Sequence, residues 1–288
     1  MHLLVLSLLS LVLMVVSVIV QMTFGGVNMN QAGNESALLL WNSFSQLMIF
    51  ALPALLVVRI YYAGAERGFL RLDFSPRRWL LALVGVGVLA LSIPLIECLT
   101  QWNDGWHWTG PWEAVERKLR AIGQQSQLTV QAMMTYCHPL LNLFGLALVP
   151  AVCEELFFRA GVQNLLHRWL SKSLSTRYSP LSTHLAIWLT AAIFSLVHGE
   201  VFAFMPRFAL GALLGYLYSY GQSILVNITV HFINNAIVVA LYWLAANGVS
   251  SVDPEVTMAL PWPMVVGCSA AAVVVLWFVF VKRLKTSK

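Results

Sequence analysis

Residues 139–159 read PLLNLFGLALVPAVCEELFFR, and this stretch decides what kind of fold the chain can form. It holds no charged residue until the adjacent carboxylates Glu154 and Glu155, which Arg159 follows. A carboxylate in a lipid-spanning helix costs roughly 2.5–3.5 kcal/mol on insertion scales, so it normally faces a protein interior or a water-filled cavity. The stretch therefore predicts a membrane-spanning helix that carries a functional site.

Helical geometry separates the three charges. Residues four apart share a helix face, whereas neighbours differ by about 100°. Glu155 and Arg159 are therefore expected to pair along their own helix, and Glu154 is left without a counter-ion on that helix. A carboxylate in that position suits a general base or acid. The alternative is a structural ion pair that locks helices together.

The composition excludes an ordinary soluble domain. The 288 residues are 59% hydrophobic and only 10% charged, with a mean hydropathy of +0.76. About a quarter of the residues of a soluble globular domain are charged. The net charge of +5 does not indicate nucleic acid here, because the basic residues lie in short runs beside apolar segments, where they determine topology. We predict an all-α, polytopic membrane protein with the lipid bilayer as its surroundings.

Apolar segments predict about eight transmembrane helices. Small residues in the sixth, Gly211, Ala212 and Gly215, are expected to permit close helix approach, and Pro53 is expected to kink the second. The predicted spans are about 3–22, 38–61, 79–100, 136–169, 181–199, a segment that follows Pro206-Arg207, 224–246 and 261–281.

Charges in the loops predict the orientation. The loop 62–78, the loop 168–177 and the tail after residue 281 are basic, whereas 25–36 and 252–255 hold no Lys or Arg. Because cytoplasmic loops are enriched in Lys and Arg, both termini are expected in the cytoplasm, and a bacterial inner (plasma) membrane is the expected location.

A further amphipathic helix is predicted over 111–122. Trp112, Val115, Leu119 and Ile122 recur at helical spacing, opposite a face with Glu113, Glu116, Arg117 and Arg120. A helix in the membrane interface and a loop helix packed on the bundle both account for this pattern.

Two other spans each bring a histidine into apolar surroundings. His198 ends the fifth span, one turn after Phe194, and His231 lies inside the seventh, where Asn235 shares its face. Asn227 and Asn234 are expected to point to other faces and to bond neighbouring helices. Counting along straight helices places Glu154 towards the cytoplasmic side and His198 towards the outer side, so tilted or broken helices are needed to bring them together.

Glu-Glu-x-x-x-Arg, then Phe-x-x-x-His, then His-x-x-x-Asn, on successive predicted spans, resembles the CAAX protease and bacteriocin-processing family of intramembrane proteases. That family includes the CAAX prenyl endopeptidases. The resemblance covers about residues 136–246, a four-helix catalytic core, between an N-terminal part (1–135: spans one to three and the interfacial helix) and a C-terminal span with a basic tail (247–288).

The resemblance implies a role for each matched residue. Glu154 would activate a water molecule, Glu155 and Arg159 would support it, and His198 would assist with the water or the leaving amine. His231 and Asn235 would stabilise the oxyanion. We expect no cofactor, although Glu154, His198 and His231 also make a possible zinc ligand set.

Three functions fit these features. The first is an intramembrane endopeptidase that cleaves a membrane-associated protein or peptide substrate by Glu/His-activated water. The second is a non-catalytic membrane scaffold or bacteriocin-immunity-type protein that binds a partner through the same cluster. The third, a proton-coupled transporter, is disfavoured because the sequence shows no internal repeat.

Overall fold

The computed structural model describes residues 2–24, 34–72, 75–173, 180–250 and 259–282. This part of the chain is helical and contains no strand. The α-helices are α1 (His2–Phe24), α2 (Glu35–Gln46), α3 (Leu52–Tyr61), α4 (Glu66–Leu70), α5 (Pro76–Asp104), α6 (Glu113–Tyr136), α7 (Pro139–Asn142), α8 (Val149–Glu154), α9 (Asn164–Ser173), α10 (Pro180–Val197), α11 (Phe204–Gly221), α12 (Ile224–Ala246) and α13 (Trp262–Val275). Wider π-helical segments are η1 (Leu47–Ala51), η3 (Leu143–Leu148), η4 (Glu155–Gln163) and η6 (Leu276–Lys282), and 3₁₀ turns are η2 (Gly110–Trp112) and η5 (Val201–Ala203).

The described residues contain six helices that are long and apolar enough to cross a membrane, and two shorter apolar helices. They correspond to the eight predicted spans, so the predicted fold class is confirmed. The six are Glu35–Tyr61, Pro76–Asp104, Pro139–Ser173, Val201–Gly221, Ile224–Ala246 and Trp262–Val279, and the shorter two are Leu4–Met14 and Leu181–Val197.

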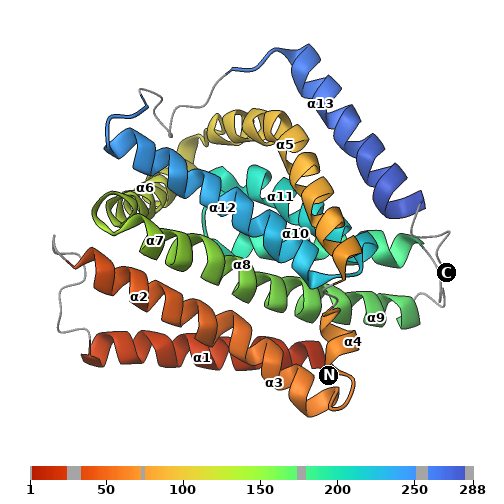
Figure 1. The fold of residues 1–288 in the computed structure, drawn as a ribbon. Coiled ribbons are helices and arrows are strands. Elements are labelled where there is room, and N and C mark those ends of the chain that lie inside the picture. Colours follow the sequence, from red (N-terminus) through yellow and green to blue (C-terminus); the bar gives the residue numbers. More distant parts are fainter. Residues whose placement is uncertain (1, 25–33, 73–74, 174–179, 251–258, 283–288) are drawn as a thin grey trace.

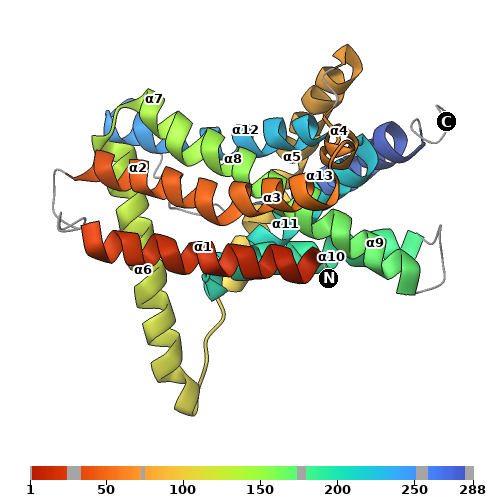
Figure 2. The same cartoon turned by 90° about the horizontal axis from the view of Figure 1, so that it is seen from below.

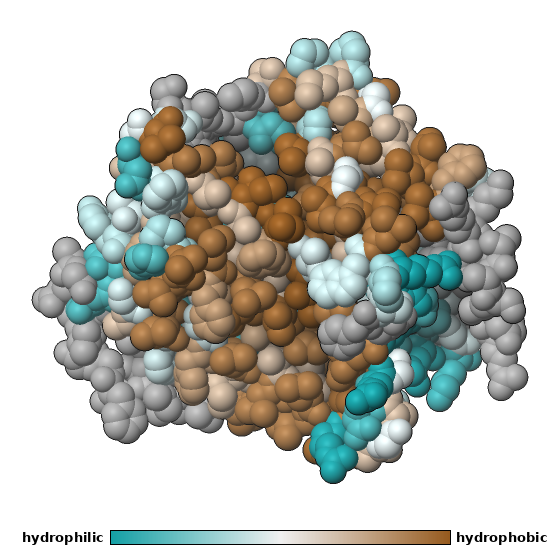
Figure 3. All heavy atoms as spheres, viewed as in Figure 1, coloured by the Kyte–Doolittle hydropathy of each residue, from teal (hydrophilic) through white to brown (hydrophobic). Residues whose placement is uncertain are grey.

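Large apolar side chains cover the outside of this bundle. Leu40 is 63% exposed and Leu83 is 68% exposed, which a soluble protein would avoid over so wide an area. Figure 3 shows hydrophobic residues across the middle of one face and hydrophilic residues gathered towards two of its ends. This arrangement is that of a protein surrounded by lipid along the middle of its helices.

α1, the helix from α2 to α3 and the helix from α7 to α9 lie roughly along one direction in both views (Figures 1 and 2), and elements with many basic residues lie at one end of them. α3 and α9 end there, α4 lies there, and α1 begins there. We call this the basic end; its basic side chains are Arg59, Arg67, Arg71, Arg77, Arg78, Arg168 and Lys172. The described parts of two predicted basic loops, 62–78 and 168–177, therefore lie at one end, whereas the predicted basic tail, 283–288, lies outside the described residues.

α6 crosses the other helices at the opposite end of the bundle, which we call the α6 end (Figure 2). The predicted amphipathic helix is thus present, but it continues to Tyr136. Its apolar residues Trp112 and Ile122 are each 64% exposed, whereas Glu116 of the predicted polar face is buried. Glu116 is buried because the main-chain groups of the loop before α6 need hydrogen-bond partners when they are removed from water.

Glu116 and Arg120 supply those partners. Glu116 accepts hydrogen bonds from the Trp108 N–H at 2.6 Å and from Arg120 Nε at 2.8 Å. Arg120 Nη2 donates to the main-chain oxygens of Asp104 and Trp106, each at 2.8 Å. The bond from the Trp108 N–H, then those from Arg120 and His107, lower the pKa of Glu116 from 4.5 to about 2.

This shift predicts a pH-dependent contribution to stability. Because the pKa of Glu116 is lower in the folded protein, its contribution is present above pH 4.5 and is lost as the pH falls towards 2. We expect Glu116→Gln to lower the thermal unfolding midpoint at pH 7, and the difference from wild type to shrink as the pH falls through this range. Glu113→Gln, an exposed position on the same helix, is the control. An equal effect of the two variants at pH 7 would contradict this role.

Prolines account for two of the wide turns. Pro53 and Pro150 follow η1 and η3, respectively, inside otherwise continuous helices. A proline inside a helix lacks an N–H and its ring clashes with the carbonyl four residues earlier. Bonding at i→i+5 in the preceding turn relieves this conflict without ending the helix. The continuous helix 139–173 that results crosses the middle of the bundle (Figure 1, α7 to α9).

The predicted close approach of the small residues in α11 is confirmed. A Cβ on Gly215 would lie 2.8 Å from Ile187 Cγ2, and a Cβ on Gly211 would lie 3.2 Å from the Ala191 Cα. α10 therefore packs directly on α11, and this contact positions the residues at the C-terminal end of α10.

Candidate active site

Glu155 is the centre of a fully buried polar cluster. It lies at the start of η4, and its carboxylate pairs with Arg159 Nε at 3.3 Å, as the spacing predicts. Both side chains have an exposed fraction of 0%. α12 supplies two more contacts, because Asn227 Nδ2 donates to Glu155 Oε2 at 3.1 Å and His231 Nδ1 lies 2.9 Å from Glu155 Oε1. The cluster therefore fixes the register between η4 and α12.

The contact with Glu155 orients the imidazole of His231. An ionised carboxylate can only accept, so His231 Nδ1 carries a hydrogen and donates it to Glu155. The other ring nitrogen, Nε2, then faces Glu154, whose Oε2 lies 3.8 Å away. Orientation of a histidine through one nitrogen, with the other left for chemistry, is how catalytic and metal-binding histidines are held.

Glu154 has a different environment from its neighbour. It ends α8, is 5% exposed, and accepts a hydrogen bond from Gln46 Nε2 of α2 at 3.3 Å. Among the described contacts, the nearest side chain that can carry a positive charge is His231. Its Nε2 lies beyond hydrogen-bond distance of Glu154 Oε2. A water molecule can join polar groups that lie beyond direct hydrogen-bond distance. The two adjacent carboxylates thus share His231, but the ion pair with Arg159 belongs to Glu155, as the helical geometry predicts.

His198 follows the last residue of α10, and its side chain is exposed. Its Nδ1 lies 2.7 Å from the Phe194 main-chain oxygen. A carbonyl can only accept, so Nδ1 donates and Nε2 of the neutral ring is the acceptor. The Phe194 ring lies 4.8 Å from the His198 ring and 6.2 Å from the His231 ring, centroid to centroid. Phe194 therefore lies next to both histidines.

The structure brings the end of α10 close to the helix of Glu154, although counting along straight helices placed Glu154 and His198 towards opposite sides of the membrane. The fourth span extends from Pro139 to Ser173, longer than the predicted 136–169 at its C-terminal end, and Glu154 lies near its middle. Phe194, one turn before His198, packs on the Phe158 ring and lies 5.1 Å from the Arg159 guanidinium carbon, so the end of α10 reaches the segment that carries Glu154.

Asn235 lies one turn after His231 on α12 and is half-buried. Its Oδ1 accepts a hydrogen bond from Asn234 Nδ2 at 3.2 Å. The expectation that Asn227 points away from His231 is wrong. Asn227 precedes His231 by four residues, so the two share a face, and both contact Glu155.

Gln46 is a site residue that the sequence analysis did not find. It ends α2 directly before η1, in a span that carries no recognisable motif. A lone glutamine in an apolar span gives a weak signal in sequence, because no residue near it in the chain points to a role. Polar residues in membrane helices do, however, face the bundle interior as a rule, and that signal was available.

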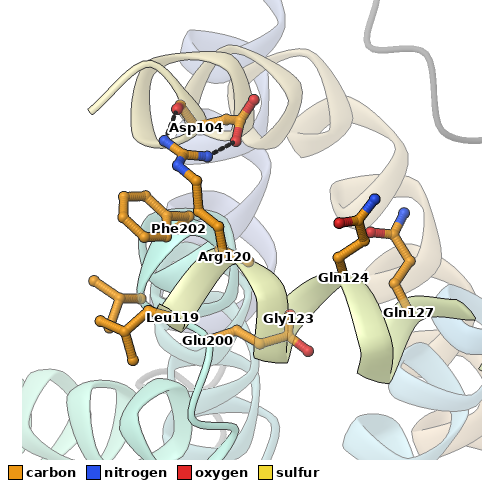
Figure 4. Close-up of a pocket in the computed structure, with 10 residues that line it drawn as sticks. Asp104, Leu119, Arg120, Gly123, Gln124, Gln127, Glu200 and Phe202 are labelled. Carbon is orange, nitrogen blue, oxygen red and sulfur yellow. Dashed lines mark hydrogen bonds and ion pairs between the residues drawn. The ribbon is translucent and has the colours of Figure 1, made fainter. Parts of the chain in front are cut away.

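Two cavities lie at the α6 end, and α6 contributes to both. One, of about 340 Å³, is lined by Gln124, Glu200 and Phe202, and Glu200 follows His198 by two residues. Figure 4 shows Arg120 of α6 bonded to Asp104 in this cavity, with the side chains of Gln124 and Gln127 further along the helix. The second, of about 370 Å³, lies between α2 and α6.

The second cavity follows the face of α2 that carries Gln46. Asn42, four residues before Gln46, lines it together with Ser45 and Thr129. One cavity thus lies beside the chain segment of His198, and the other beside the helix face whose glutamine holds Glu154. Each cavity provides space for water and for polar groups beside a chain segment that carries a residue of the site.

The possible zinc ligand set does not fit. Within the described ranges, no group of three or more His, Cys, Asp or Glu side chains is placed to hold a metal ion. Glu154, His198 and His231 are accordingly not placed as one ligand set, and the expectation of a metal-free site stays a prediction.

Fold and cluster together define a class: an integral membrane protein of apolar helices with a buried Glu–Arg–His cluster at its centre. Residues 136–237 match the family model described as type II CAAX prenyl endopeptidase Rce1-like. The resemblance inferred from the three motifs is thus confirmed over the segment that carries them. No curated protein and no solved structure matches the chain. The segment that carries the three motifs is thus similar to a family of membrane proteases.

Proposed function

We propose that the protein is an intramembrane endopeptidase that hydrolyses a peptide bond of a membrane-associated protein or peptide. The observation that carries this proposal is the separation of roles between the two carboxylates. Glu155 is neutralised by Arg159 and orients His231, whereas Glu154 keeps a carboxylate oxygen directed at His231 Nε2. A buried carboxylate with one amide donor suits a general base.

The reaction follows from these positions. Glu154 takes a proton from a water molecule, whose oxygen attacks the carbonyl carbon of the scissile peptide. His231, when protonated at Nε2, and the Asn235 amide donate hydrogen bonds to the oxyanion that forms. The C–N bond then breaks, and the leaving amine receives the proton that Glu154 took from the water, or a proton from His198 when the His198 ring is protonated at Nε2. Each of these groups belongs to the segment that matches the protease family.

The substrate is expected to approach at the α6 end. The two cavities lie there. His198 and Gln46 are the site residues that lie nearest in sequence to the residues lining these cavities. With the basic end in the cytoplasm, as the positive-inside rule favours, both termini would be cytoplasmic and the cavities would open on the opposite side of a bacterial inner membrane. Cleavage would then take place away from the cytoplasm.

His198→Ala tests this function. Loss of a positioned proton donor or acceptor lowers a rate by roughly 10²–10⁴-fold. We expect a membrane protein or peptide to accumulate uncleaved in cells that carry His198→Ala, measured by quantitative proteomics of their membranes against wild type. His184→Ala is the matched control, because His184 lies in the same helix but bonds the Tyr216 hydroxyl. Identical cleavage products in all three strains would refute a catalytic role for His198.

A further inference from the structure

The loop between α10 and α11 begins with His198 and is short. It consists of residues 198–203, from the histidine to the end of η5. Gly199 follows His198 directly and has a φ of +71°, a left-handed conformation that glycine adopts without a steric penalty. The chain therefore turns away from α10 immediately after the histidine. The contacts that hold residues 200–205 then determine the direction in which the chain leaves His198.

Asn103, in the last turn of α5, holds this loop through both ends of its side-chain amide. Its Nδ2 donates to the Val201 main-chain oxygen at 3.2 Å, and its Oδ1 accepts from the Met205 N–H at 2.7 Å. Asn103 is fully buried. Met205 belongs to the first turn of α11, where N–H groups have no partner inside the helix. Asn103 thus ties η5 and the start of α11 to α5.

Two further contacts hold the same loop. Ser195, three residues before His198, is 1% exposed, and its Oγ donates to the Phe204 main-chain oxygen at 2.7 Å. From α6, the Arg120 guanidinium carbon lies 3.9 Å from the centre of the Phe202 ring (Figure 4). The loop is thus fixed to α5, α6 and α10 within a few residues of the histidine.

Among the described residues, the hydrogen bonds of His198 itself are confined to α10. Its Nδ1 donates to the Phe194 oxygen at 2.7 Å, and its main-chain N–H donates to the Ser195 oxygen at 3.3 Å. Both acceptors are carbonyls of the last helical turn, and helix ends fray unless something beyond them holds the chain. The direction of His198 Nε2 therefore depends on the loop as well as on α10.

We propose that Asn103 is a positioning residue, which fixes the loop so that His198 Nε2 can exchange a proton with the water or the leaving amine. This inference rests on the role proposed for His198. An amide suits the position, because it supplies a donor and an acceptor together without placing a charge in a buried site. Asn103 lies outside the segment 136–237 that matches the protease family, so the three motifs do not point to it.

The first test needs no substrate. Hydrogen–deuterium exchange with mass spectrometry, on the full chain purified in detergent, follows the amides of residues 198–205. We expect Asn103→Leu, which removes two bonds to the loop, and Ser195→Ala, which removes the third, to exchange faster than wild type there. Asn142→Leu is the matched control, because Asn142 is also fully buried and donates to two main-chain oxygens before α7. Its exchange over 198–205 should equal that of wild type.

Turnover then shows whether the loop acts through His198. A reacting group misplaced by about 1 Å costs up to about 10²-fold, so Asn103→Leu should lower kcat by roughly 10–10²-fold with little change in KM. The assay is single turnover of the substrate that the proteomic comparison of wild type and His198→Ala identifies. In the His198→Ala background, Asn103→Leu should cause no further loss, since the group it positions is absent. Any loss from Asn142→Leu should be equal in both backgrounds.

Ser195→Ala keeps the test decisive if Asn103→Leu does not fold, because it removes only one hydroxyl and should follow the same pattern with a smaller loss. Faster exchange over 198–205 together with a loss of turnover that disappears in the His198→Ala background supports the proposal. Unchanged exchange in both variants, or a loss as large without His198 as with it, overturns the proposal. Wild-type turnover by His198→Ala would instead refute the proposed role of His198, and the exchange rates would still report the hold of Asn103 on the loop.

Discussion

Glu154→Gln should reduce the rate of peptide cleavage by roughly 10²–10⁴-fold, the contribution of a positioned general base. The substitution keeps the size of the side chain and removes its ability to take a proton. The amide oxygen of the substituted side chain can still accept from Gln46 Nε2, so the contact that now spans 3.3 Å can persist. The measurement is turnover by purified protein of the substrate that the proteomic comparison identifies.

A structural role for Glu154 would give a different pattern. If the carboxylate served only to join α8 to α2 and α12, Glu154→Gln and Gln46→Leu would lower the thermal unfolding midpoint and activity together. We expect the midpoint of Glu154→Gln to stay close to that of wild type while turnover is lost. Gln46→Leu, which leaves Glu154 without its amide donor, should retain part of the activity. Full turnover by Glu154→Gln would rule out the proposed mechanism.

Arg159→Met should have the largest effect on stability, a loss of about 3–5 kcal/mol, because it leaves the Glu155 carboxylate buried without its cation. Both side chains are fully buried, so solvent cannot compensate for the change. The guanidinium itself is incompletely satisfied: Nη1 and Nη2 have no hydrogen-bond partner among the described residues. The measurement is unfolding of the detergent-solubilised protein by heat.

A double variant identifies the origin of that loss. Combining Glu155→Gln with Arg159→Met removes both charges, and we expect it to be more stable than Arg159→Met alone, since a neutral pair needs no counter-ion. Additive losses would mean that Arg159 acts through packing, for example against the Phe194 ring 5.1 Å away, and not through its charge. The His231 contact with position 155 remains in both variants as an internal reference.

The sequence predicted the number and places of the apolar helices well, because lipid imposes long uncharged segments that are visible without any tertiary information. The length of α6 was underestimated. Its second half, from Gly123 to Tyr136, is polar enough to resemble a loop, and only its packing at the α6 end accounts for a helix there. The inward direction of Glu116 and Arg120 depends on main-chain groups of the loop before α6, which helical periodicity does not reveal.

The candidate site was predictable where side chains four apart on one helix decide the contact. Glu155 with Arg159 is such a pair, and Asn227 with His231 would have been another had the same spacing been applied to it. Contacts between distant spans were not predictable in this way. Gln46 reaches Glu154 from a helix 108 positions earlier, and the π-helical turns that follow from Pro53 and Pro150 change the register of the helices that meet there.

His231 contacts both members of an adjacent carboxylate pair, through a different ring nitrogen for each. Substitution of any one of the three side chains therefore changes the surroundings of the other two. The effects of residues in contact are not additive, so double variants are needed to assign a role to each member of the triad.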